Sequence, residues 1–286
     1  MQFWVIQTLN SLSLGGLLFL LSSGFSLIFG LMRIANLTHG GFFMLGAYIG
    51  VSILKYWPNL WFAALGAGIT VAVCGGLLER FILRKLAGNA LGQVLVTLGV
   101  AFIIADLCLI IWGGDPVPVP TPDWLQRPLR VGGFAFPAYR VMVVGIAIVT
   151  AIALHGLLER TRLGAMIRAG VDDMQMARAV GIPVSRLFTT VFCLGAVLAG
   201  AGGVIGGPIL SAYPGLDGDM LPLALIIVIL GGVGSLMGAF VGSFIIGFVY
   251  TFGIALLPDL AYVILFLPMI FVIAFRPQGL FGRQSA

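Results

Sequence analysis

The chain has 286 residues, of which 60% are hydrophobic and only 9% are charged, and its formal net charge is +5. A soluble domain carries roughly 25% charged residues, so this composition excludes a soluble globular enzyme, a nucleic-acid-binding domain and a disordered chain. The basic residues are scattered rather than clustered, so the positive charge indicates no nucleic-acid partner. The composition predicts an integral membrane protein in a lipid bilayer.

Apolar stretches long enough to form membrane segments recur along the whole chain. A helix needs about 20 residues to cross the hydrocarbon core. The nine stretches centre on residues 5–31, 41–57, 60–78, 91–112, 139–157, 187–207, 220–233, 236–257 and 260–275. Some are short, so the pairs around Pro58 and around 231–234 stay open to a second interpretation, as re-entrant halves. We predict an all-α polytopic bundle of eight to ten membrane segments, forming one transmembrane domain over residues 1–286.

The distribution of lysine and arginine predicts the orientation of the chain. With nine crossings and the N-terminus outside, 11 of the 15 basic residues fall in inside loops. They are Arg33, Arg80, Arg84, Lys85, Arg160, Arg162, Arg168, Arg178, Arg186, Arg276 and Arg283. This asymmetry favours an N-terminus outside and a C-terminus inside.

Two of the predicted loops are long. The outer one, residues 113–138, has six prolines, which favour extended structure and disfavour a helix; we expect it to lie across the outer surface as a lid or docking surface. In the inner one, residues 158–186, we predict a short helix from Asp172 to Val180, stopped by Gly181–Ile182–Pro183. The alternative is an ordinary solvated connector.

Small residues recur at helical spacing, and part of this pattern suggests an internal repeat. Residues 42–50 and 234–242 share a Gly-Ala-aromatic string, which also recurs by chance in apolar sequences. Paired elements in two halves of a transporter are typical of structural repeats. We expect the small residues to serve close helix packing; they are Gly46, Gly50, Gly195, Ala199, Gly203, Gly234, Gly238 and Gly242.

The sequence lacks the motifs of an enzyme. It has no phosphate-binding G-x-x-x-x-G-K-[ST] run, no H-E-x-x-H motif and only two histidines, and its three cysteines lie singly in apolar stretches, so we predict no catalytic residue, metal site or bound cofactor. Among the acidic residues, Asp106 lies inside an apolar stretch. Buried charge in a membrane is typical of function, so Asp106 either contacts a transported molecule or hydrogen-bonds to a neighbouring helix.

Several motifs, in order along nearly the whole chain, carry a resemblance to a known family. They are IANLTHGGFFMLGAY at 34–48, RLGAMIRA at 162–169, MARAVGI at 176–182, LGGVGSLMGA at 230–239 and RPQGLFG at 276–282. Together they resemble LivH-type permeases, the membrane subunits of branched-chain amino acid ABC importers.

The resemblance implies a transport subunit of the bacterial inner membrane that forms half of a translocation path. It implies a LivM-type second permease, two ABC ATPase subunits that bind ATP and Mg²⁺, and a periplasmic substrate-binding protein. The inner connector matches the family's ATPase-coupling region, at Asp172, Asp173, Met176, Ala177, Ala179, Gly181 and Pro183. The glutamate-alanine-alanine opening of the general coupling motif is absent, which puts individual contacts there in doubt.

Asn36, Thr38 and His39 are our candidates for the substrate path, together with Asp106. The first three are polar groups in a glycine-bounded break between two apolar segments, where unwound backbone can line a cavity. The alternative is that Asn36 caps the following helix and His39 bonds across helices.

The cargo and the transport mechanism each leave alternatives open. Related systems carry urea, short amides or aromatic acids. A stand-alone ion-coupled carrier and a non-transport scaffold are the other classes of function that the sequence leaves open.

Overall fold

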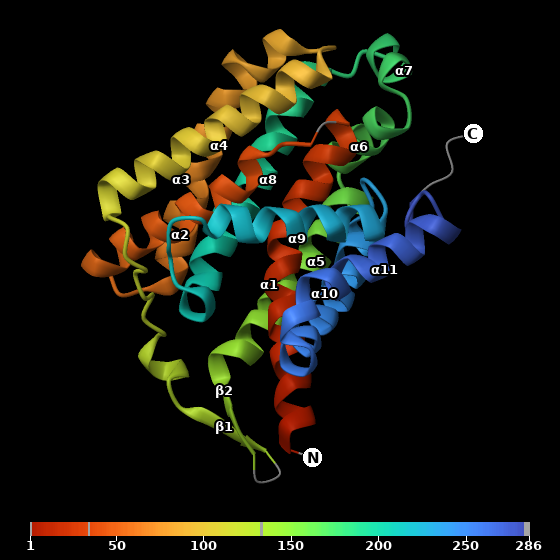
Figure 1. The fold of residues 1–286 in the computed structure, drawn as a ribbon. Helices are drawn as coiled ribbons and strands as arrows, with labels where there is room; N and C mark the ends of the chain where they lie inside the picture. Colours follow the sequence, from red (N-terminus) through yellow and green to blue (C-terminus); the bar gives the residue numbers. More distant parts are fainter. Residues whose placement is uncertain (1, 34, 132–133, 283–286) are drawn as a thin grey trace.

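The computed structural model describes residues 2–33, 35–131 and 134–282, and over these residues the chain is mainly α-helical (Figure 1). The α-helices are α1 (Gln2–Met32), α2 (Thr38–Tyr56), α3 (Leu60–Phe81), α4 (Ala90–Trp112), α5 (Ala138–Arg160), α6 (Arg162–Asp172), α7 (Met174–Ala179), α8 (Val184–Leu210), α9 (Leu216–Gly231), α10 (Leu236–Leu256) and α11 (Ala261–Phe275). Three short 3-10 helices join them, namely η1 (Leu83–Leu86), η2 (Asp123–Leu125) and η3 (Pro258–Leu260).

Each of the nine predicted apolar stretches lies in one of these helices, with at most two residues beyond its ends, and the prediction of an all-α polytopic membrane protein is confirmed. In the described part of the chain, six helices are long and apolar enough to cross a membrane: α1, α3 extended through η1, α4, α5, α8 and α10. Helices α9 and α11 have 16 and 15 residues, fewer than the about 20 that a perpendicular crossing needs. The exact number of full crossings stays a prediction.

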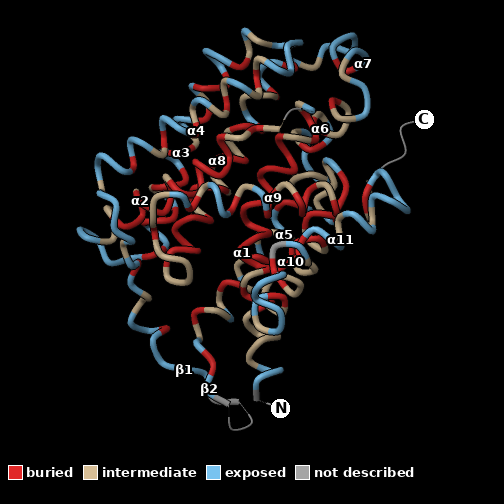
Figure 2. The backbone as a smooth tube through the Cα atoms, in the orientation of Figure 1, coloured by how far each residue is buried: buried red, intermediate tan, exposed pale blue. Residues whose placement is uncertain are grey.

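Helix α1 is the centre of the bundle. In its most apolar window 89% of the residues are buried, against 22% in α4 and 17% in α5 (Figure 2). Helix α4 nevertheless has the highest mean hydropathy of the six, 2.8. A water-soluble protein would bury its most apolar helix. Here the helix with the highest hydropathy is among the least buried, as expected of helices that face lipid or another membrane protein.

Close packing between helices depends on glycine. A Cβ placed on Gly46 of α2 would lie 2.5 Å from the Cα of Gly200 in α8, so the two backbones touch there. A Cβ added at any of the other candidate packing glycines would also contact a residue of a neighbouring segment. The pairs are Gly50 with Val204, Gly195 with Gly24, Gly203 with Phe43, Gly234 with Gly30, Gly238 with Gly231 and Gly242 with Ile227. Ala199 is fully buried. Small residues let helices approach to backbone contact in the membrane. The internal repeat stays a prediction.

The proline-rich segment 113–138 contains more regular structure than we expected. It holds η2 and an antiparallel hairpin of β1 (Pro128–Val131) and β2 (Phe134–Pro137), which projects from the bundle beside the N-terminal end of α1 (Figure 1). Pro128 pairs with Pro137 at the open end of the hairpin, and prolines are tolerated at strand ends. Val117 and Ala212 exchange backbone hydrogen bonds of 2.7 and 3.0 Å, which join this segment to the end of α8.

The inner connector forms two helices where we predicted one, and the predicted start at Asp172 was wrong. Asp172 is the last residue of α6, and the extended residue Asp173 separates it from α7. The Asp173 carboxylate accepts hydrogen bonds from the backbone N–H groups of Gln175 and Met176, at 2.8 and 3.0 Å, and so caps α7. Gly181, with φ of +86°, follows the end of α7.

Candidate functional site

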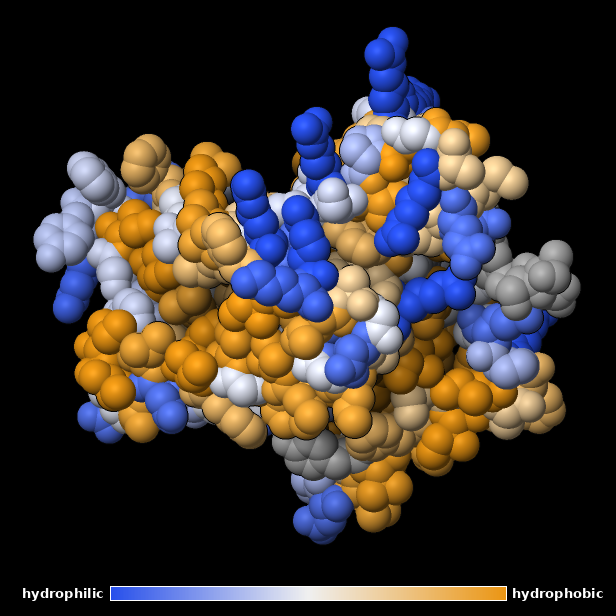
Figure 3. Space-filling model, turned by 90° about the horizontal axis from the view of Figure 1, so that it is seen from above, coloured by the Kyte–Doolittle hydropathy of each residue, from blue (hydrophilic) through white to orange (hydrophobic). Residues whose placement is uncertain are grey.

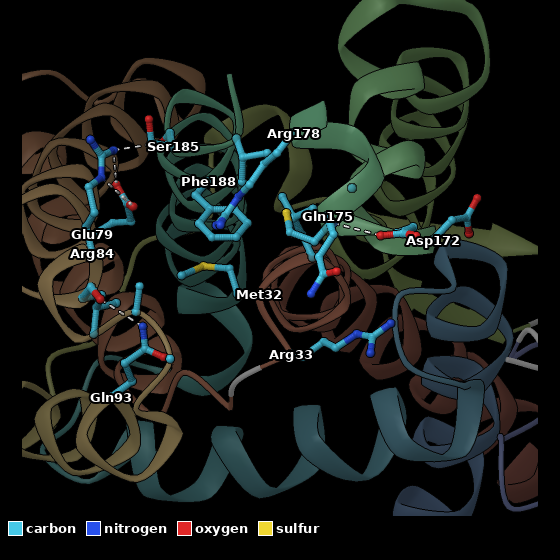
Figure 4. Close-up of a pocket in the computed structure, with 18 residues that line it drawn as sticks. Met32, Arg33, Glu79, Arg84, Gln93, Asp172, Gln175, Arg178, Ser185 and Phe188 are labelled. Atoms are coloured by element: carbon cyan, nitrogen blue, oxygen red, sulfur yellow. Dashed lines mark hydrogen bonds and ion pairs between the residues drawn. The ribbon is translucent and has the colours of Figure 1, made fainter. Parts of the chain in front are cut away.

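A cavity of about 700 Å³ opens at the end of the bundle where α6 and α7 lie. The end of α1, η1, the α6–α7 connector and the start of α8 form its walls, as Figure 4 shows with Met32 and Phe188 near the middle. Hydrophilic side chains gather on this end of the molecule (Figure 3). We call it the α7 cavity.

A network of charged and hydroxyl groups forms one wall of the α7 cavity. The carboxylate of Glu79, fully buried at the end of α3, pairs with Arg84 of η1 at 3.1 Å. Thr189 of α8 donates a hydrogen bond of 2.6 Å to the same carboxylate oxygen, and the Arg84 guanidinium also donates to the Ser185 carbonyl oxygen at 2.9 Å. The network ties α3 and η1 to the first turns of α8.

We did not predict this network from the sequence. The close spacing of Glu79 and Arg84 was the available signal, but we counted Arg84 only among the basic residues of the inside loops. Their partners Ser185 and Thr189 lie about 100 residues later, and only the fold brings them close.

The break between α1 and α2 lies beneath the α7 cavity. Arg33 has φ of +55°, which turns the chain back from α1, and Ile34 is outside the described residues. Thr38 donates a hydrogen bond to the backbone carbonyl oxygen of Thr97 in α4 at 2.7 Å, and the N–H of Leu37 donates to the hydroxyl of Thr97 at 3.3 Å. The break is therefore fixed to α4.

Asn36 combines a structural bond with an unpartnered amide. Its Oδ1 accepts a hydrogen bond from the N–H of Thr38, the first residue of α2, at 3.2 Å, whereas the N-cap position of that helix is Leu37. Its buried Nδ2 has no hydrogen-bond partner among the described residues. Asn36 borders a small void with Gln93, Thr97 and Phe192, and Gln93 also lines the α7 cavity. The small void at Asn36 therefore shares a wall residue with the α7 cavity.

His39 bonds across helices. Its Nε2 lies 3.0 Å from the carbonyl oxygen of Leu21 in α1, and since a carbonyl oxygen can only accept, Nε2 carries the proton. The ring also contacts that of Phe25, and Nδ1 is buried without a partner among the described residues. An unpartnered buried acceptor costs free energy unless water or a ligand reaches it.

The structure brings three of the four candidate path residues together and separates the fourth. Asn36 lies in the break, and Thr38 and His39 are the first two residues of α2, whereas Asp106 lies on the exposed face of α4. Nine residues separate Asp106 from Thr97, about 13 Å along the helix axis. Asp106 is therefore not part of this cluster.

The candidate coupling residues lie around α7. Ala177 is buried against the bundle, and the apolar side chains of Met176 and Val180 are 60% and 68% exposed. Asp172, Asp173, Ala179, Gly181 and Pro183 are also exposed. Large apolar side chains on a polar surface are typical of protein contact sites.

Comparisons with known proteins show the family of this chain. The family described as "Branched-chain amino acid transport system / permease component" matches residues 7–273. The chain is 28% identical to the high-affinity branched-chain amino acid transport system permease protein BraD of Pseudomonas aeruginosa, over 98% of this chain and 96% of that protein.

Two further sequence relatives come from one organism, Salmonella typhimurium. Its permease protein LivH is 24% identical over 99% of this chain and 97% of its own length. Its permease protein LivM is 28% identical over 91% of this chain and 67% of its own length.

One solved structure has a similar fold. PsaBC from Streptococcus pneumoniae, in complex with Fab, superposes with a TM-score of 0.51 at 15% identity, covering 93% of this chain and 90% of the other. The long apolar helices and the family match together identify a multi-pass membrane protein. The chain belongs to the family of branched-chain amino acid transport system permease components.

Proposed function

We propose that the chain is a permease subunit of an ATP-driven importer of branched-chain amino acids. The observation that carries the proposal is the match to BraD, a branched-chain amino acid permease, over nearly the full length of both chains. The names of the relatives favour branched-chain amino acids over urea, short amides and aromatic acids. The subunit would form half of the translocation path with a LivM-type permease.

We propose that α7 and its flanks receive the ATPase subunits. Met176 and Val180 present an apolar surface, Asp173 caps the helix, and Gly181 and Pro183 fix the turn into α8. A short helix held at both ends can transmit a push without unfolding. The chain has no nucleotide-binding motif, so ATP and Mg²⁺ would bind to the partner ATPases and this subunit would not be an enzyme.

The α7 cavity would be the inner mouth of the substrate path. A small void that shares Met32, Leu83 and Gln93 with this cavity borders Asn36, whose buried Nδ2 has no partner among the described residues. This assignment puts α7 in the cytoplasm, the N-terminus outside, and a periplasmic binding protein on the hairpin side of a bacterial inner membrane. Arg283, one of the basic residues used to predict the orientation, lies outside the described residues.

The double variant Gly181→Ala and Pro183→Ala tests the coupling role. Removing both turn residues loosens the connection from α7 to α8, so leucine uptake by the reconstituted complex should fall at least tenfold while ATP hydrolysis continues. Gly113→Ala is the matched control: Gly113 also has a left-handed backbone, φ +86°, with no atom within 4 Å of its missing Cβ, but it follows the end of α4 and lines neither the connector nor the α7 cavity. Unchanged uptake in the double variant would contradict the coupling role.

Competition measures the substrate class. Unlabelled isoleucine and valine should block uptake of labelled leucine by the complex with its binding protein, and urea, acetamide and phenylalanine should not. Uptake in vesicles without ATP, driven by an ion gradient, would instead establish a secondary carrier.

A further inference from the structure

Asp106 is a charged side chain on α4, which has the highest mean hydropathy of the six long helices. It is exposed on α4, and no described residue forms an ion pair or hydrogen bond with it. Phe102, Ile103 and Ile110, one turn away on either side, are 58–78% exposed. Every other charged residue described in the six long apolar helices lies within about one turn of a helix end.

Contact with lipid is unfavourable for the carboxylate of Asp106. Six residues separate it from Trp112, which ends α4, so its carboxylate lies about 9 Å along the axis from that end. Long lysine and arginine side chains can reach the headgroups from such a depth, but the aspartate side chain is too short. Acidic residues within membrane segments almost always face protein or water. Something other than lipid must therefore cover this face.

Gly99 lies on the same face, one to two turns along α4 from Ile103 and Asp106. It is exposed, and a Cβ placed on it would meet no atom within 4 Å. The glycines in the core of this bundle are the points where helix backbones touch. On α4 such a point is left without a neighbour, as expected of a face on which another helix packs.

We propose that this α4 face, defined by Gly99, Ile103, Asp106 and Ile110, is where a second permease chain of the LivM kind packs, and that this chain donates a hydrogen bond or an ion pair to Asp106. Salmonella typhimurium has two permease proteins, LivH and LivM, named for one kind of transport system, and both are related to this chain. A homologous second chain is thus the occupant that the comparisons favour. The inference rests on the proposed function.

Photo-crosslinking tests the position of the contact. The variant Ile103→p-benzoylphenylalanine is expressed with its native partners and irradiated in the membrane, and the adducts are identified by mass spectrometry. We expect an adduct with the second permease. Ile152→p-benzoylphenylalanine on α5, where Ile152 is 67% exposed, is the matched control and should react only with lipid.

Two results would overturn the assignment of the α4 face. One is an adduct with the second permease from position 152 in place of 103. The other is an adduct of position 103 only with lipid or with a second copy of this chain.

Substitution of Asp106 tests the polar contact. Asp106→Leu makes α4 more apolar, so insertion into the membrane is preserved, but the donor on the partner is left unpaired. We expect at least tenfold less second permease to copurify with it, whereas Asp106→Asn, which keeps an acceptor, should retain most of it. Equal recovery with Asp106→Leu and the unchanged chain would refute the contact.

These results are separable from those for the proposed function. A complex that contains a second permease and transports leucine, but crosslinks from α5, leaves the function in place and removes this inference. An unchanged chain that recovers no second permease and no ATPase removes the proposed function itself.

Discussion

Thr189 joins the two charges in the wall of the α7 cavity, and its replacement by valine tests that network. Its hydroxyl accepts a hydrogen bond from Arg84 and donates one to the buried carboxylate of Glu79. Hydrogen bonds to charged groups contribute about 1.5–3 kcal/mol. Arg84 is partly exposed, at 36% of its side chain, which reduces its share. We expect Thr189→Val, which keeps the side-chain shape, to lower the free energy of unfolding by about 2 kcal/mol.

The neighbouring residue provides the control. Thr190 has the same chemistry, but its hydroxyl donates only to the Arg186 carbonyl oxygen of its own helix, at 2.9 Å. Such bonds contribute little to helix stability, so Thr190→Val should change the free energy of unfolding by less than about 0.5 kcal/mol. The assay is unfolding by sodium dodecyl sulfate in mixed micelles, followed by circular dichroism.

A double-mutant cycle separates the network from general packing. In a Glu79→Gln background the carboxylate charge is gone, so Thr189→Val should cost about 1 kcal/mol less than in the unchanged chain. Equal losses for Thr189→Val and Thr190→Val, or no coupling in the cycle, would refute the reasoning.

Two further predictions concern packing and topology. Gly46→Ala should destabilise the chain by about 1–3 kcal/mol in the same assay, because the new Cβ would lie 2.5 Å from the Cα of Gly200 and force α2 and α8 apart; Gly145→Ala, on open surface of α5, should not, and equal stability of the two variants would contradict the packing. A cysteine at position 120 should react with a membrane-impermeant maleimide from outside intact cells, and one at position 175 only after permeabilisation. Both positions are exposed, and the reverse labelling pattern would overturn the orientation.

Hydropathy located the membrane helices because lipid-facing and core-facing helices both need long apolar runs. It could not rank them by burial: α4 is the most apolar of the six long helices and among the most exposed. The start of α7 was misplaced because adjacent acids suit either side of a helix boundary, and only the extended backbone of Asp173 decides between them.

The candidate site shows the same limit. Asn36, Thr38 and His39 could be selected from their polar character in an apolar sequence, and the structure groups them at the start of α2. Their partners Thr97 and Leu21, and the links from Glu79 to Thr189, depend on contacts between segments distant in the chain. No local pattern specifies such contacts.

Helix α8 connects the α7 end of the molecule to the proline-rich segment at the opposite end. It is one unbroken helix of 27 residues, about 40 Å long, which follows α7 at one end and is joined through Ala212 to Val117 at the other. A tilt of 5° would displace its two ends relative to each other by about 3.5 Å. The helix is long enough to span a bilayer, and if it tilts as a rigid body we expect a movement of α7 at one end to be accompanied by a movement of the proline-rich segment at the other.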